Sequence, residues 1–125
     1  MASEKDLFSV SVPVSVDMSA YQYCWVKLDA DGLLTPITAV TDVALGILQN
    51  DPEVVGEVGN VMVFGQSKLK MDAVCDEGAI LAPHDNGTGQ VAVATQYPGA
   101  IALQACTAQN EYISVILTLP VMVKA

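Results

Sequence analysis

Charged residues are scarce in this sequence, and the positive ones are the scarcest. Only 15% of the 125 residues are charged, where a soluble domain usually carries roughly a quarter. Fourteen acidic residues stand against five basic ones, all of them isolated lysines, and the net charge is −9. Binding to DNA, RNA or an anionic membrane depends on clustered cations, so this composition excludes those partners.

Long apolar runs are missing as well. The longest, from Val115 to Val123, is interrupted by Pro120 and is too short to cross a bilayer. The start of the chain carries acidic residues where a secretory signal peptide has a positive end and an apolar block. We therefore expect a protein that is synthesised in the cytoplasm and has no membrane partner.

Cysteine and histidine are too few for a disulfide framework, a zinc site or a catalytic triad. The cysteines Cys24, Cys75 and Cys106 are odd in number, far apart and set among apolar residues, which predicts buried free thiols. The single histidine, His84, lies beside Asp85 in a turn sequence, with no nucleophile at a suitable spacing. We expect no enzymatic activity, no cofactor and no metal.

Apolar residues are abundant, at 52% of the sequence. A single domain of this length can bury a core without help from metals or disulfides. Because so few charges are available to cover the exterior, part of the surface is expected to be buried against other chains. The composition thus predicts an oligomer.

The centre of the sequence predicts two strands joined by a loop. Residues 43–50 and 61–71 are apolar and rich in β-branched side chains, and the connection between them contains proline and two glycines. A similar arrangement recurs in residues 99–105 and 112–117, where the glycine, the isoleucine and a Leu-Gln pair are repeated. We interpret these segments as two related strand pairs that close one core.

The N-terminal region alternates strictly between apolar and polar residues, which predicts a strand with one apolar face. Pro13 cannot donate to a hydrogen-bond ladder, so this strand is expected at a sheet edge or in an arm. Two alternatives remain open: the strand adds to the sheet of a partner protein, or it closes the sheet of its own domain. The apolar residues, which are the candidate partner-binding side chains of this strand, are Phe8, Val10, Val12, Val14 and Val16.

The next segment, residues 21–28, also alternates and is expected to be a strand covered on both sides. Tyr21, Tyr23 and Trp25 would lie on one face, as a candidate subunit interface or stacking surface. Further along, Asn86-Gly87 predicts a type I′ hairpin turn between short strands at 79–82 and 90–95.

No segment has a convincing helical period, and turn signals recur along the whole chain. The predicted fold class is all-β: a small single-domain β-barrel or sandwich with little or no helix. Residues 1–19 are expected to form an extended N-terminal arm, and residues 20–125 the barrel domain.

Several short motifs follow one another in a distinctive order. Gly-Ile-Leu-Gln-Asn at 46–50 is followed by Gly-Gln-Ser-Lys at 65–68 and by Gly-Ala-Ile-Ala-Leu at 99–103. Further positions in the pattern are Tyr23, Val26-Lys27, Asp31-Gly32, Gly56, Val61, Val63, Gly78, Asp85, Gly87, Ala94, Glu111 and Val115-Ile116-Leu117. This succession, over residues 20–118, resembles the bacteriophage capsid decoration, or cement, protein family.

The resemblance implies a small β-barrel that binds the outside of an assembled head at threefold positions, usually as a trimer, and stabilises the shell against internal DNA pressure. The implied partners are the major capsid protein and other copies of the chain, and the implied location is the exterior of the virion. We expect residues 1–16 to add to the sheet of the major capsid protein. Residues 71–77 depart from the glycine-rich turn that is usual in the family, and residues 120–125 extend beyond the matched pattern.

A different class of function is also consistent with the sequence. The aromatic row Tyr21, Tyr23 and Trp25 would supply a stacking face for sugars in a glycan-binding or adhesive module of a virion. A subunit of a phage tail or fibre is a nearer alternative, which differs from a decoration protein in symmetry more than in chemistry.

Overall fold

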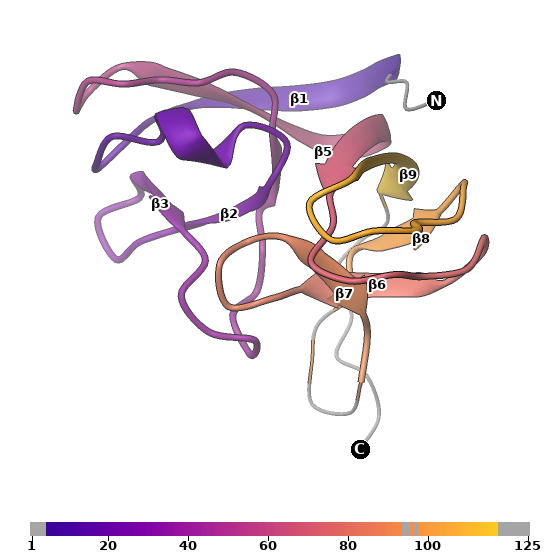
Figure 1. Cartoon of the computed structure of the whole chain (residues 1–125). Coiled ribbons are helices and arrows are strands. Elements are labelled where there is room, and N and C mark those ends of the chain that lie inside the picture. The colour runs from indigo at the N-terminus through magenta and orange to yellow at the C-terminus, as the bar shows by residue number, and fades with distance from the viewer. Residues whose placement is uncertain (1–4, 94–95, 97, 118–125) are drawn as a thin grey trace.

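The computed structural model describes residues 5–93, 96 and 98–117. Within these ranges the chain is all-β: nine strands form one antiparallel sheet, with a single three-residue 3-10 turn and no α-helix. The sheet curls into a half-barrel (Figure 1), which confirms the expected fold class. The elements are β1 (Lys5–Pro13), η1 (Ser19–Tyr21), β2 (Trp25–Leu28), β3 (Leu34–Pro36), β4 (Gly46–Leu48), β5 (Val58–Lys70), β6 (Ile80–Pro83), β7 (Gly89–Val91), β8 (Ala100–Ala102) and β9 (Tyr112–Leu117).

The long strand β5 is the axis of the sheet, whose strand order is β3-β2-β4-β5-β9-β8-β6-β7. It pairs with β4 near its start, with β9 near its end, and with β1 from Val58 to Gln66. The two strand pairs expected from the sequence are both present, since β4 pairs with β5 and β8 pairs with β9. Figure 1 shows the β1–β5 ribbon running along one side of the molecule, with β6, β7 and β8 on the opposite side.

The two halves of the sheet repeat the same pairing pattern. Hairpin β2–β3 corresponds to hairpin β6–β7, strand β4 to β8, and the start of β5 to β9. The sequence offset between corresponding residues is nearly constant along the chain, and the strands pair in matching register. The corresponding cross-strand lines are Trp25–Ile47–Met62 in the first half and Ile80–Ile101–Ile116 in the second.

The repeat extends to hydrogen bonds outside the strands. Tyr23 donates its backbone N–H to Leu48 O at 2.7 Å, and in the second half Gly78 donates to Ala102 O at 2.8 Å. Both donors have positive φ, 63° for Tyr23 and 80° for Gly78. A tyrosine therefore occupies a left-handed position that the second half gives to glycine, the residue that adopts it without steric cost.

The predicted type I′ turn at Asn86-Gly87 is wrong. Pro83 pairs with Gly89, so residues 84–88 form a longer loop, which His84 closes by donating its N–H to Thr88 O at 2.7 Å. Asn86 accepts the backbone N–H and the hydroxyl of Thr88 through Oδ1, at 3.2 and 2.6 Å. The asparagine side chain thus organises a side-chain-capped turn instead of a two-residue hairpin.

Two buried clusters form the core. The smaller one packs the N-terminal segment against the first half of the sheet, and the larger one lies between the two halves. The smaller cluster contains Val14, Met18, Val26, Leu34, Leu48 and Val61. The larger contains Trp25, Ile47 and Met62 from the first half, together with Leu81, Ala102 and Val115 from the second. All three cysteines are buried free thiols, as the sequence predicted.

Candidate functional site

Strand β1 pairs with β5 of its own chain, which was one of the two alternatives left open by the sequence. Its apolar side chains divide into two groups. Val10 and Val12 pack against the smaller core cluster and Val14 is fully buried in it. Phe8 and Val16 are exposed, and Phe8 lies opposite the exposed Phe64 of β5. Of the five candidate capsid-binding residues, Phe8 and Val16 are therefore the ones presented at the surface.

The outer edge of β1 can be located from the hydrogen bonds of β5. Asn60 uses both backbone groups on the side away from β1: its O accepts from Gln49 N at 2.7 Å, and its N donates to Asn50 Oδ1 at 2.9 Å. Ser11, directly opposite Asn60, thus forms a non-hydrogen-bonded pair with it. The backbone N–H and C=O of Ser11 consequently point away from β5.

The side chains support this assignment. Ser11 Oγ donates to Asn60 Oδ1 at 3.0 Å, as expected for a non-hydrogen-bonded pair, in which facing side chains lie closest. The backbone nitrogen of Pro13, two residues later in the strand, faces the same outer side. Because it points away from β5, its lack of a hydrogen costs no hydrogen bond between β1 and β5. β1 is a nine-residue edge strand, whereas β3 and β7, at the two ends of the sheet, have three residues each.

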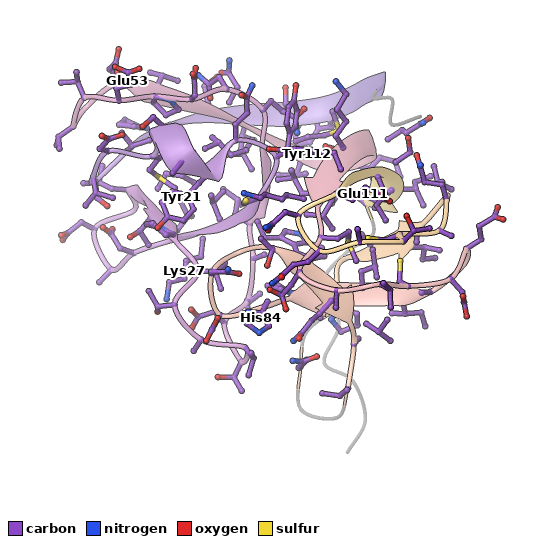
Figure 2. All side chains as sticks on the ribbon, viewed as in Figure 1. Tyr21, Lys27, Glu53, His84, Glu111 and Tyr112 are labelled. Atoms are coloured by element: carbon purple, nitrogen blue, oxygen red, sulfur yellow. The ribbon has the colours of Figure 1, made fainter. Side chains whose placement is uncertain are left out.

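The expected row of three aromatic side chains on one strand face is wrong. Residues 19–21 form the 3-10 turn η1, Tyr23 has a φ of 63°, and β2 begins only at Trp25. Trp25 is 1% exposed and belongs to the larger core cluster. Tyr21, which is labelled in Figure 2, packs against the smaller cluster. A left-handed residue breaks the period-2 alternation, so the three side chains point in different directions.

Tyr23 instead pairs with Tyr112 of β9. Their ring centroids are 5.9 Å apart at an interplanar angle of 85°, an edge-to-face arrangement. With Gln22 and Lys68 they line an open surface pocket of about 300 Å³; Tyr112, at the start of β9, is labelled in Figure 2. The sheet brings the rings together, because Lys70 pairs with Tyr112 and donates its backbone N–H to Tyr23 O at 2.9 Å.

The pocket is positively charged on an acidic protein. Lys68 Nζ lies 5.2 Å from the centre of the Tyr23 ring, a cation–π contact, and within the described residues it makes no ion pair. Lys27, in contrast, is 2.7 Å from Asp42. Burial opposes ionisation of Asp42, but hydrogen bonds from Lys27 and from the Thr38 and Ala39 backbones lower its pKa below the ordinary value. Lys68 is not neutralised in this way within the described residues, so the pocket can attract an anionic or hydroxyl-rich ligand.

His84 lies in the β6–β7 loop (Figure 2), where its Nδ1 is 2.7 Å from Asp85 Oδ1 and its Nε2 is 3.7 Å from Asp72 Oδ2. Two carboxylates flank it. Across the described ranges there is no group of three or more His, Cys, Asp or Glu side chains that could hold a metal ion. In the same ranges, no helix is long and apolar enough to cross a membrane.

No protein-family model matches this chain, and no curated protein is significantly similar to it. The candidate surfaces accordingly rest on geometry alone. They are the β1 edge with Phe8 and Phe64, and the pocket between Tyr23 and Tyr112. The sequence pointed to β1 and to Tyr23, but it gave no signal that Gln22, Lys68 and Tyr112 lie beside Tyr23, because their proximity depends on the pairing of β5 with β9.

Proposed function

We propose that this chain is a structural virion protein that binds the outer surface of a bacteriophage head, as a homotrimer at threefold positions. There it stabilises the capsid against the pressure of the packaged DNA. The order of the motifs between residues 20 and 118 supports this proposal. The all-β architecture is compatible with it, since decoration requires a rigid, compact domain and no catalytic centre.

The observation that carries the proposal is the edge of β1. At the outer edge of β1 the backbone N–H and C=O of Ser11 point away from β5, and a partner strand can extend the sheet there. Phe8 and Phe64, paired across β1 and β5, add an exposed aromatic surface to the same ribbon. On this proposal, a strand of the major capsid protein pairs with the outer edge of β1 and covers Phe8.

Deleting the N-terminal segment would not test this cleanly, because Val14 and Met18 belong to the core. Ser11→Pro removes one outward N–H and leaves the β1–β5 ladder intact. Ser11→Ala is the matched control, because both variants lose the hydrogen bond to Asn60 but alanine keeps the N–H. Proline at this edge position should not disturb the preceding residue, which is already extended.

Co-sedimentation with undecorated phage heads measures the effect. We expect wild type and Ser11→Ala to bind saturably and Ser11→Pro to bind at least about 10-fold more weakly, since backbone pairing provides much of the affinity in strand addition. Both variants should unfold within about 1 kcal/mol of each other, because they lose the same side-chain bond. Equal binding by the two variants would reject the β1 edge as the capsid-binding site.

A glycan-binding role is the second candidate, and the Tyr23–Tyr112 pocket is the observation that favours it. We expect a carboxylate-bearing saccharide to bind there, with a sugar face against Tyr112 and the carboxylate near Lys68. On a glycan array, Tyr112→Ala and Lys68→Met should abolish the signal, and Tyr112→Phe should retain it because the ring is kept. Absence of any signal from the wild type would eliminate this function and would leave the decoration proposal unaffected.

A further inference from the structure

Three isoleucines form an exposed line across the second half of the sheet. Ile80 of β6 pairs with Ile101 of β8, and Ile101 pairs with Ile116 of β9. Their exposed fractions are 56%, 37% and 39%. The three side chains lie on one face, because directly opposed residues in a sheet point the same way. We refer to Ile80, Ile101 and Ile116 as the isoleucine ladder.

In the first half the corresponding line of side chains is buried. Its corresponding residues, Trp25, Ile47 and Met62, are at most 1% exposed. They belong to the cluster that also contains Leu81, Ala102 and Val115 from the second half. In the first half, therefore, a second strand layer covers the line that the second half leaves open.

This relation extends through the molecule as a series of layers. The N-terminal segment, with Val14 and Met18, covers one face of the first half. The other face of the first half covers the inner face of the second. The outer face of the second half, which carries the isoleucine ladder, ends the series, and within the described residues no layer covers it. The second half thus repeats the packing of the first half, except that within the described residues its outer face has no covering layer.

The surroundings of the ladder suit a contact between identical chains. Ile116 pairs on its other side with Gln66. Of the same-face neighbours two residues along the strands, Leu103 is exposed, whereas Ala82 and Ser114 are buried. None of these residues carries a carboxylate, and Lys68, which pairs with Ser114 on the same face, carries a positive charge. Copies of a chain with a net charge of −9 repel one another, so a face without carboxylates is where they can approach most closely.

We infer that the isoleucine ladder is the face through which copies of this chain associate. In a closed ring each subunit turns the same face toward the symmetry axis, so three ladders can meet at a threefold axis and bury one another. The inference refines the homotrimer of the proposed function by naming its subunit contact. It can be tested separately from decoration, because self-association is measured in the absence of heads.

The test is light scattering of the full-length protein over a range of concentrations, with Ile80→Lys as the variant. Val54→Lys is the matched control, since Val54 is an exposed apolar residue in the β4–β5 connection, and the substitution introduces the same side chain and the same charge. We expect wild type and Val54→Lys to associate. Ile80→Lys should associate at least about 100-fold more weakly, because an unpaired ammonium would be buried at each contact.

A second variant covers the case in which Ile80→Lys affects folding. Ile101→Thr keeps a β-branched side chain at the centre of the ladder and should also weaken association, with a circular dichroism spectrum unchanged from wild type. A wild type that remains monomeric, or ladder variants that associate as tightly as Val54→Lys, would overturn the inference. If the wild type is monomeric, and the melting temperature of Ile80→Lys but not of Val54→Lys is below that of the wild type, then a segment of the same chain covers the ladder. That result would also overturn the inference.

Discussion

At the scale of single residues, Tyr23 shows how a local conformation can redirect a surface. The residue holds a left-handed conformation that costs roughly 1 kcal/mol or more for a side chain larger than glycine. The corresponding residue in the second half is Gly78. Keeping a tyrosine at this position turns its ring toward Tyr112 and Lys68 and creates a pocket that the second half lacks a side chain to form.

The cysteines give a prediction at the same scale. Burial raises the pKa of the Cys24 thiol to about 11, and it also raises the pKa values of Cys75 and Cys106 above their ordinary value. The thiolate is the reactive form, so alkylation at pH 8 should be at least about 100-fold slower for Cys24 in the native protein than in denaturant.

Mass spectrometry after a timed pulse of iodoacetamide measures this rate. Rapid labelling of Cys24 under native conditions would show that the core around β2 opens readily. It would contradict the burial of Cys24, which is 2% exposed.

At the scale of secondary-structure elements, glycines set how closely the strands of the first half approach. A Cβ on Gly46 of β4 would collide with the backbone O of Met62 in β5, and one on Gly59 would lie 2.6 Å from Leu34 Cδ2. A strand backbone cannot yield without breaking its ladder, but the end of a leucine side chain can rotate. The two substitutions should therefore differ in cost.

We predict that Gly46→Ala destabilises the fold by about 3 kcal/mol or more, and Gly59→Ala by about 1–2 kcal/mol. Urea unfolding followed by the fluorescence of Trp25, which pairs with Ile47 of β4, measures both values. If Gly59→Ala proved the more damaging of the two, the close approach of β4 to β5 would have to be revised.

The elements themselves were largely predictable from the sequence, because alternation and turn residues mark the strands directly. The pairs formed by residues 43–50 with 61–71, and by 99–105 with 112–117, were identified from this pattern and are present as β4–β5 and β8–β9. The same pattern failed at residues 21–24, where one left-handed tyrosine interrupts a strand that alternation would continue.

The candidate surfaces were less predictable, since they depend on which strands become neighbours. Alternation showed that β1 has an apolar face, but it could not show whether β5 or a partner strand pairs with it. Likewise, the exposed isoleucines come from three strands, and only their register places them in one line. Long-range pairing is decided by the packing of the whole sheet, and local sequence carries little information about it.

At the scale of the whole molecule, the two halves resemble one another in register but differ in what covers them. The first half lies between the N-terminal segment and the second half, whereas the second half has one face packed and one face exposed. An acidic chain with few charges and an open apolar face is suited to act in an assembly. The proposals assign the β1 edge to the capsid and the isoleucine ladder to neighbouring copies, so the two contacts use different surfaces.

Sedimentation of undecorated phage heads with increasing amounts of wild-type protein is the measurement that decides whether this chain is a decoration protein. A homotrimer at threefold positions should bind saturably, with three bound chains for each occupied position. The bound protein should also raise the temperature at which DNA-filled heads release their DNA. A protein that stays in the supernatant at every concentration would contradict the decoration function.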